Sequence, residues 1–271
     1  LNIEQSKLIN LYRLWNGYSL APAVVVFSLT YRCNLDCEMC PQARSRREFM
    51  KLGGEELEFN QLRKGVDHIP YGLLRPRIHL TGGEPLLCKD FIPLIEYLKK
   101  KRFVWSMTTN GLILEKYASV VVHYQPRHLN ISIDGPKDIH NAIRGDTDSF
   151  QNAMRGIQAI RKVREEKGYD FPKVTVNCAI QEKNYRYLEE TVKSMEDSGA
   201  DSLTLEHFFF DKTNEWSMDM ARKIDVDCLK QQMIKIETTS HSIPVDFFPR
   251  IKFSDIAAYY TDISYHFGNS C

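Results

Sequence analysis

Residues 30–41 read Thr-Tyr-Arg-Cys-Asn-Leu-Asp-Cys-Glu-Met-Cys-Pro and directly follow the apolar run Val24–Leu29. They place Cys33, Cys37 and Cys40 in a CxxxCxxC triplet at the end of a predicted strand. Three closely spaced thiolates can bind three corners of a [4Fe–4S] cube and leave one iron without a protein ligand. An open coordination position separates catalytic metal sites from structural ones. The triplet therefore predicts a metal centre whose fourth position is available to another molecule.

Cysteine usage and charge set the context of this metal centre. The chain has 271 residues and 7 cysteines, whereas a disulfide framework prefers a short secreted chain with an even count. We therefore expect a reducing, cytoplasmic compartment, and we find no secretory signal and no apolar run long enough to span a bilayer. The formal net charge is +1, which gives no indication of a nucleic-acid or membrane partner. The basic run at 44–47 is interpreted as a solvated loop.

Strand-like runs alternate with helical patterns over most of the chain. After the first run, the predicted strands are Arg77–Thr81, Val104–Thr109, Leu129–Asp134, Val174–Ile180 and Ser202–Glu206. Apolar residues with helical spacing lie between them, with Asp90 as an N-cap and Gly168 and Gly199 as C-terminal caps. This alternation predicts an α/β fold built on a parallel sheet with helices outside.

The run Leu129–Asp134 favours a barrel over an open sheet. Its odd-numbered residues are apolar, whereas Asn130, Ser132 and Asp134 share the opposite face. A parallel strand covered by helices on both sides is apolar on both faces, so a polar face indicates a strand that lines a site. We predict a partial (β/α)6 TIM-like barrel of residues 21–210. An N-terminal helical lead-in precedes it at 1–20, with a helix near 3–15, and a C-terminal helical extension follows at 211–271, with a helix near 219–237.

Polar groups follow the ends of the predicted strands. Gly82-Gly83-Glu84 follows the second strand, Asn110 follows the third, and Ser132 and Asp134 close the fourth. Asn177 lies on the fifth strand. Its side chain either lines the site or is a buried amide that is hydrogen-bonded to the backbone. The carboxyl ends of parallel barrel strands share one face, where active sites are built. These groups are therefore expected to form one site with the cysteines.

The glycine pair has two interpretations. Gly82 and Gly83 form either an ordinary turn or a turn that a bound molecule can approach closely because it has no side chains. Glu84 is then expected at the barrel mouth, beside a cationic ligand.

Together these motifs resemble the radical S-adenosylmethionine (SAM) superfamily. The resemblance covers most of residues 20–206 and is strongest to members with C-terminal SPASM or twitch domains, which include anaerobic sulfatase-maturing and peptide-modifying enzymes. Its motifs are CxxxCxxC, Gly-Gly-Glu-Pro at 82–85, Thr-Thr-Asn-Gly at 108–111, Ser-Ile-Asp-Gly at 132–135 and His-Asn-Ala-Ile-Arg-Gly at 140–145.

The resemblance implies that the three cysteines hold a [4Fe–4S] cluster and that SAM binds its unique iron. The Gly-Gly-Glu segment would meet the SAM amino group, Ser132 the ribose or carboxylate, and Arg144 the carboxylate. Met39 and, on a weaker motif, Leu205 would meet adenine. The full set of expected cofactor contacts is Met39, Gly82, Gly83, Glu84, Asn110, Ser132, Asp134, Arg144, Asn177 and Leu205.

The implied activity is reductive cleavage of SAM to a 5′-deoxyadenosyl radical that abstracts hydrogen from a substrate, with flavodoxin or ferredoxin as a reductant. Our main hypothesis for the substrate is a peptide or protein side chain. The alternatives are a small-molecule or cofactor-biosynthesis enzyme on the same scaffold, and a non-catalytic zinc or Fe–S protein that binds a partner. No catalytic acid or base is identified.

The two ends of the sequence indicate a fragment of a longer protein, because it begins at Leu1 and stops at Cys271. Cys271 is either the first ligand of auxiliary Fe–S clusters that continue beyond the fragment or an ordinary free cysteine.

Overall fold

The computed structural model describes residues 22–40, 42–43, 45–46, 56–69, 75–207 and 215–261. The expected helix near 3–15 and Cys271 lie outside these ranges. The described residues contain no helix with the length and apolar character needed to cross a membrane.

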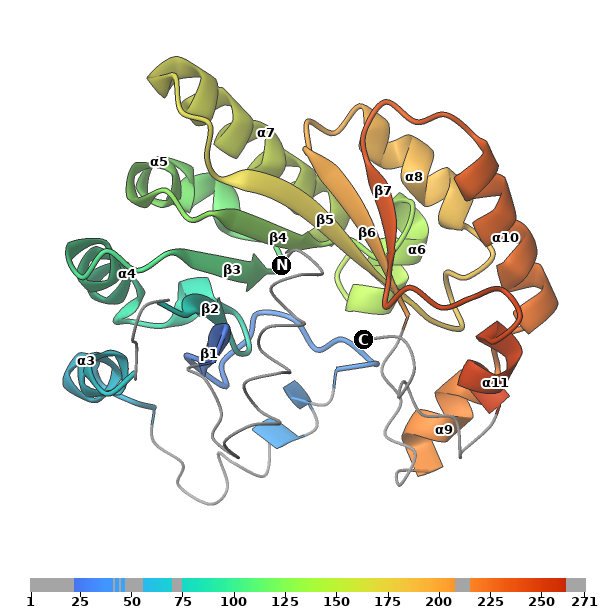
Figure 1. Cartoon of the computed structure of the whole chain (residues 1–271), viewed down its shortest axis with the longest axis horizontal. Coiled ribbons are helices and arrows are strands. Elements are labelled where there is room, and N and C mark those ends of the chain that lie inside the picture. The colour runs from blue at the N-terminus through green and yellow to red at the C-terminus, as the bar shows by residue number, and fades with distance from the viewer. Residues whose placement is uncertain are drawn as a thin grey trace, which may run out of the picture.

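A parallel sheet of seven strands forms the centre of the fold, and each strand pairs with its neighbours in sequence order. The strands are β1 (Val24–Ser28), β2 (Arg77–Thr81), β3 (Trp105–Thr109), β4 (His128–Ser132), β5 (Lys173–Ile180), β6 (Ser202–His207) and β7 (Val245–Phe248). The sheet curves into an arc, and β1 and β7 form its two edges (Figure 1). This arrangement confirms the predicted α/β partial barrel. It also adds β7, a strand from the segment that we expected to be a helical extension.

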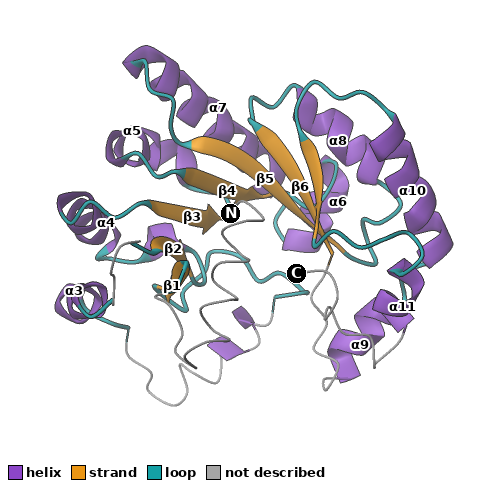
Figure 2. Ribbon diagram, viewed as in Figure 1, coloured by secondary structure: helices purple, strands orange, loops and turns teal. Residues whose placement is uncertain are grey.

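The helices are α3 (Phe59–Asp67), α4 (Phe91–Lys100), α5 (Leu114–Tyr124), α6 (Lys137–Arg144), α7 (Ser149–Lys167), α8 (Leu188–Glu196), α9 (Glu215–Arg222), α10 (Val226–Thr238) and α11 (Ile256–Thr261), with a 3-10 turn η1 (Pro85–Leu87). Helices α3, α4, α5, α7, α8 and α10 cover the outer side of the arc (Figure 2).

One predicted helix end is confirmed, and the structure differs from the prediction at two others. Gly168 ends α7 in the left-handed conformation, as predicted. Gly199 does not cap α8, which ends three residues earlier with Asp197 as its C-cap. The expected helix near 219–237 is two helices, because Asp225 accepts hydrogen bonds from the N–H groups of Asp227 and Cys228 and thereby starts α10.

The two faces of the sheet differ in polarity. The face toward the helices carries the main apolar core and includes Leu80, Met107 and Ile131, all fully buried. The opposite face lines the inside of the arc, which we call the lumen. Its residues are polar along most strands: His79 on β2, Ser106 and Thr108 on β3, Asn130 and Ser132 on β4, Thr175 and Asn177 on β5, and Thr204 and Glu206 on β6. The polar face predicted for β4 is confirmed and extends across its neighbours.

Leu205 belongs to the helix-facing side of β6. It pairs in register with Cys178 and Phe247, which are also buried, and it is 0 % exposed. Because successive strand residues point to opposite faces, Thr204 and Glu206 face the lumen instead. The Leu205 side chain is therefore a core residue, and the expected contact of Leu205 with adenine stays a prediction.

We predict that Leu205→Ala lowers the free energy of unfolding by about 2–5 kcal/mol, because it leaves a cavity in the core between β6 and its helices. Urea unfolding followed by circular dichroism measures the change. Thr204→Val, on the lumen face of the same strand, is the control and should change stability by less than about 1 kcal/mol. Equal effects of the two substitutions would show that Leu205 is not in the core.

Candidate cofactor-binding site

The three motif cysteines lie in a small apolar cluster, separate from the main core, that follows β1. Cys37 is 7 % exposed, Cys33 and Cys40 are partly buried, and all three pack with Met39 and Ile143. Ile143 belongs to α6, so the cysteine loop is held against a helix more than 100 residues away in sequence. Met39 is thus placed beside the cysteines, and its contact with adenine stays a prediction.

Donor chemistry at the thiols supports the binding of an iron–sulfur cluster. Burial raises the pKa of the Cys37 thiol, and the positive charge of Arg144 acts in the opposite direction. Arg144 Nη1 donates to Cys37 Sγ at 3.8 Å, and Asn110 Nδ2 donates to Cys33 Sγ at 3.7 Å. Such donors stabilise cluster sulfurs and tune their potential. Among the described residues, no group of three or more His, Cys, Asp and Glu side chains is arranged to hold a metal ion.

Arg46 supports the backbone of the cysteine loop. Its Nη1 donates to the carbonyl oxygens of Cys33 and Leu35, and its Nη2 pairs with Asp36 at 3.1 Å. This part of the basic run is therefore a structural clamp and not simply a solvated charge, which its sequence alone did not indicate.

The glycine pair after β2 packs directly against the chain that leads into the cysteine loop. A Cβ on Gly83 would lie 2.2 Å from the carbonyl oxygen of Arg32, and one on Gly82 would lie 2.7 Å from that of Thr30. Gly83 N also donates to the Thr30 oxygen at 2.7 Å. The close approach that requires glycine is made by the protein's own backbone.

Glu84 is completely buried at the carboxyl ends of β2 and β3, and its expected position beside a cationic ligand stays a prediction. Its Oε1 accepts from the Thr109 hydroxyl at 2.7 Å and from Leu86 N at 3.2 Å, and its Oε2 accepts from Asn110 N at 2.9 Å. Burial raises the pKa of this carboxyl, while the hydrogen bonds from Asn110, Thr109 and Leu86 oppose the shift. The side chain joins the ends of β2 and β3, and the contact of the Gly-Gly-Glu segment with a bound amino group stays a prediction.

We predict that Gly83→Ala displaces the cysteine loop, because the new methyl group cannot coexist with the Arg32 carbonyl. The expected results are a stability loss of about 3 kcal/mol in denaturant unfolding and reduced iron content after reconstitution. Gly168→Ala is the control: it also replaces a glycine, at φ +65, but has nothing within 4 Å of the new Cβ. If both variants retain full iron content, the close packing of Gly83 does not position the loop.

Asn110 connects the end of β3 to the cysteine loop. Its Nδ2 donates to Asn34 Oδ1 at 2.8 Å as well as to Cys33, and its Oδ1 accepts from Leu112 N at 3.0 Å. All polar groups of this side chain are therefore used within the protein. Asn110 is a support for the cysteine loop in this structure, and its direct contact with SAM stays a prediction.

A buried ion pair reaches the cysteines from the other side. Arg144 Nη2 lies 2.6 Å from Asp134 Oδ2, and the two side chains are 12 % and 1 % exposed. Asp134 Oδ1 accepts from Ala179 N at 3.0 Å, which anchors the pair to β5. The guanidinium thus spans from Asp134 to Cys37, and its Nε is buried without a hydrogen-bond partner. That N–H is a donor without a partner, and the expected contact of Arg144 with a carboxylate stays a prediction.

Two polar residues that the sequence analysis did not assign hold Asp134 in place. His140 Nδ1 accepts from Asp134 N at 3.0 Å, and burial lowers the pKa of His140 to about 4, so the ring is neutral at neutral pH. Asn184 Nδ2 donates to the carbonyl oxygens of Asp134 and Ala179. Their signal in the sequence is weak, because a buried side chain that binds backbone has no characteristic spacing.

Ser132 and Asn177 lie beside each other on the lumen face. They pair in register across β4 and β5, and Asn177 Nδ2 donates to Glu206 Oε1 at 2.6 Å. Ser132 and Asn177 are thus brought together as expected, while Glu206 was not identified from the sequence. Its alternation with Leu203 and Leu205 on β6 could have identified it.

We predict that Asp134→Asn destabilises the fold by about 3–5 kcal/mol, because the buried guanidinium loses its opposite charge. Denaturant unfolding measures this effect. Glu165→Gln, which breaks the exposed pair between Arg161 and Glu165, is the control and should cost less than about 1 kcal/mol. A neutral Asp134→Asn would contradict the structural role of the ion pair.

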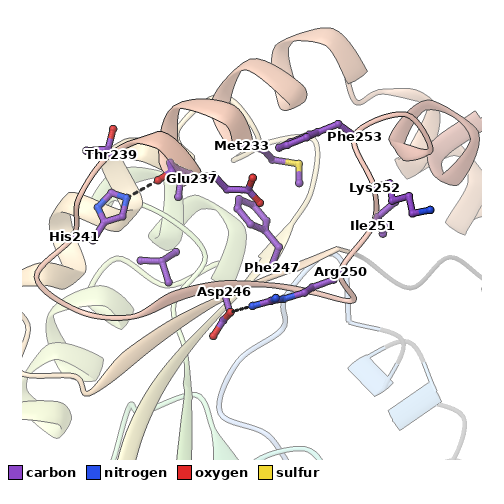
Figure 3. Close-up of a pocket in the computed structure, with 12 residues that line it drawn as sticks. Met233, Glu237, Thr239, His241, Asp246, Phe247, Arg250, Ile251, Lys252 and Phe253 are labelled. Carbon is purple, nitrogen blue, oxygen red and sulfur yellow. Dashed lines mark hydrogen bonds and ion pairs between the residues drawn. The ribbon is translucent and has the colours of Figure 1, made fainter. Parts of the chain in front are cut away.

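A separate cavity of about 620 Å³ lies between α10 and the edge strand β7 (Figure 3). Met233, Phe247 and Phe253 line it, and Asp246 and Arg250 form an ion pair at its border. It contains none of the expected cofactor contacts, so the site at the carboxyl ends of the strands is the better candidate for chemistry.

Comparison with known proteins identifies relatives of the strand-forming region. The sequence model of the radical SAM superfamily matches residues 27–195. Pre-heme d1 synthase of Dinoroseobacter shibae is 30 % identical over 189 residues, which cover 69 % of this chain and 44 % of that protein. GTP 3′,8-cyclase of Trichodesmium erythraeum is 36 % identical over 156 residues, covering 55 % and 45 %. The chain spans about half the length of the curated relatives it matches.

Among solved structures, Streptococcus suis SuiB bound to S-adenosylmethionine aligns with a TM-score of 0.62 over 96 % of this chain and 60 % of that one. The identity is 15 %, so this similarity establishes the shared fold.

Proposed function

This chain belongs to the radical SAM superfamily, and we propose that it is the SAM-cleaving core of an enzyme that acts on a small molecule of cofactor biosynthesis. The family implies a [4Fe–4S] cluster and SAM as cofactors. In the proposal, Cys33, Cys37 and Cys40 bind three irons. When bound, the cluster supplies one electron and SAM supplies the radical that removes hydrogen from the substrate.

The observation that carries this proposal is the triplet of cysteines with two N–H donors on its sulfurs. Cys33 accepts a hydrogen bond from Asn110 at the end of β3, and Cys37 accepts one from Arg144 on α6. Cys40 lies in the same apolar cluster. These two donors orient the thiols of Cys33 and Cys37 and would stabilise the sulfurs of a bound cluster, whereas burial raises the pKa of both thiols. The match to the radical SAM superfamily favours an iron–sulfur enzyme over a non-catalytic zinc protein.

The remaining residues orient SAM in the proposal. The backbone of Gly82–Glu84 offers carbonyl oxygens to the amino group, Arg144 Nε is the unpartnered donor for the carboxylate, and Ser132 and Asn177 face the nucleoside. These groups hold the cofactor against the strand ends, and the apolar cluster around Met39 keeps water from the cysteines. A reductant such as flavodoxin or ferredoxin supplies the electrons.

The substrate class rests on the named relatives. Pre-heme d1 synthase, AdoMet-dependent heme synthases and GTP 3′,8-cyclase make or use small molecules, and they support our alternative hypothesis better than the peptide hypothesis. A small molecule also suits a lumen lined by hydrogen-bonding side chains. The peptide hypothesis, the SPASM or twitch assignment and auxiliary clusters beyond Cys271 rest on sequence motifs and on a shared fold.

We predict that anaerobic reconstitution gives a brown protein with about four irons that forms 5′-deoxyadenosine from SAM under dithionite. Cys37→Ala should lose both properties, because it removes one of three ligands. Cys228→Ala, outside the motif on α10, is the matched control and should retain both. A colourless wild-type protein that holds one zinc and forms no 5′-deoxyadenosine would exclude the proposed activity.

A second assay distinguishes a small-molecule substrate from a peptide substrate. Fe-coproporphyrin III, GTP and a panel of peptides are added separately, and 5′-deoxyadenosine formation and product mass are measured. Stimulation by a small molecule supports the proposal. Stimulation by peptides alone would support the original hypothesis instead.

A further inference from the structure

Basic side chains form a row across the lumen in the amino-terminal half of the sheet. His79 on β2 pairs in register with Ser106 on β3, and Ser106 pairs with His128 on β4. His128 pairs in turn with Lys173 on β5. Arg77 lies two residues before His79 on β2, so its side chain points to the same face of the sheet. We call Arg77, His79, His128 and Lys173 the basic row. Neighbouring strands lie about 4.8 Å apart, so the row spans roughly 14 Å across the sheet.

The basic row has no acidic counterpart. Among the described residues, no ion pair involves Arg77 or Lys173, and both side chains are exposed, so an entering ligand can reach them. Burial lowers the pKa of His128, and the positive charges of Arg127 and Arg77 lower it further. Positive groups that lie close together without a carboxylate repel one another, and a bound anion would relieve this repulsion. The row therefore favours a ligand with negative charge.

Two histidines in one row could instead indicate a metal site, but the hydrogen bonds of His79 argue against it. Its Nδ1 lies 2.8 Å from Ser106 Oγ, and its Nε2 lies 3.0 Å from Thr108 Oγ1. Burial lowers the pKa of His79, so the ring is neutral, and its N–H and its lone pair each meet a hydroxyl group. Neither nitrogen is left for a metal ion, and the charges of Arg77 and Lys173 would repel a cation.

The basic row lies at the opposite end of the lumen from the cysteine site. His128 is four residues before Ser132 on β4, which corresponds to roughly 13 Å at about 3.3 Å per residue. The carboxyl ends of the strands carry the acidic groups instead, with Asp134 after β4 and Glu206 on β6. The lumen is therefore positive toward the amino ends of the strands and acidic toward the carboxyl ends. This separation of charge orients a ligand whose anionic groups lie away from the cysteines.

We propose that Arg77, His128 and Lys173 bind the anionic groups of the substrate, which is a small molecule with two or more negative charges. The proposal rests on the function proposed above and narrows its substrate class. A guanidinium group binds a carboxylate or phosphate through two parallel hydrogen bonds, an ammonium group binds it as a point charge, and the imidazole of His128 adds an N–H. The carboxylates of a tetrapyrrole and the phosphates of a nucleotide share this chemistry, so the experiment uses one ligand of each kind.

The test measures equilibrium binding of Fe-coproporphyrin III and of GTP, each to the cluster-loaded full chain without SAM and without reductant. Wild-type protein should bind at least one of them. Arg77→Gln and Lys173→Gln should each weaken that binding about 10-fold, because each removes a charge-assisted hydrogen bond, and the double variant should weaken it about 100-fold. The matched control combines Arg161→Gln and Lys193→Gln, which remove the same charge from the outer helices α7 and α8, and it should bind like wild type.

The outcomes separate this inference from the proposed function. A wild-type chain that binds neither anion would overturn the inference, and so would a double variant that binds as tightly as wild type. Equal weakening in the control would also overturn it, because net charge alone would then explain the effect. Weakening for Fe-coproporphyrin III alone supports it with carboxylates as the anionic groups, and weakening for GTP alone supports it with phosphates.

Thermal unfolding of all variants identifies a loss of binding that is due to misfolding. The proposed function is tested separately by 5′-deoxyadenosine formation in the wild-type chain. If none is formed, that function fails, whether or not the basic row binds an anion.

Discussion

A single buried carboxylate holds together the strand ends that form the candidate site. The Glu84 side chain accepts hydrogen bonds from Thr109 and Asn110 at the end of β3, and its backbone N–H donates to the Arg32 oxygen before the cysteine loop. Asn110 in turn donates to Cys33. Because these contacts are buried, β1, β2 and β3 have one relative arrangement at their carboxyl ends. The position of the cysteines depends on it.

The second constraint is the division of the sheet into an apolar outer face and a polar lumen. Helices bury the outer face, which provides the stability of the fold, and the lumen face is left to bind ligands. The ion pair of Asp134 and Arg144 connects the lumen side of β4 and β5 to Cys37. The two halves of the site, around Glu84 and around Asp134, therefore meet at the cysteine loop from opposite sides.

Much of this architecture could be predicted from periodicity, and the exceptions have physical causes. Six strands and the polar face of β4 follow from alternation, whereas β7 has four residues and is too short to show a period. The alternation of β6 places the Leu205 side chain in the core, and its expected contact with adenine rested on a weaker motif than those of the other site residues. The burial of Glu84 and the clamp by Arg46 depend on contacts between distant segments, which local sequence does not encode.

In the proposed function, Cys33, Cys37 and Cys40 hold a cluster with one iron open to SAM. Electron paramagnetic resonance of the anaerobic, dithionite-reduced protein, recorded before and after addition of SAM, tests it most directly. The expected result is the signal of a reduced [4Fe–4S] cluster whose g values shift when SAM binds the open iron. A cluster signal that saturating SAM leaves unchanged, or the absence of any cluster signal, would contradict it.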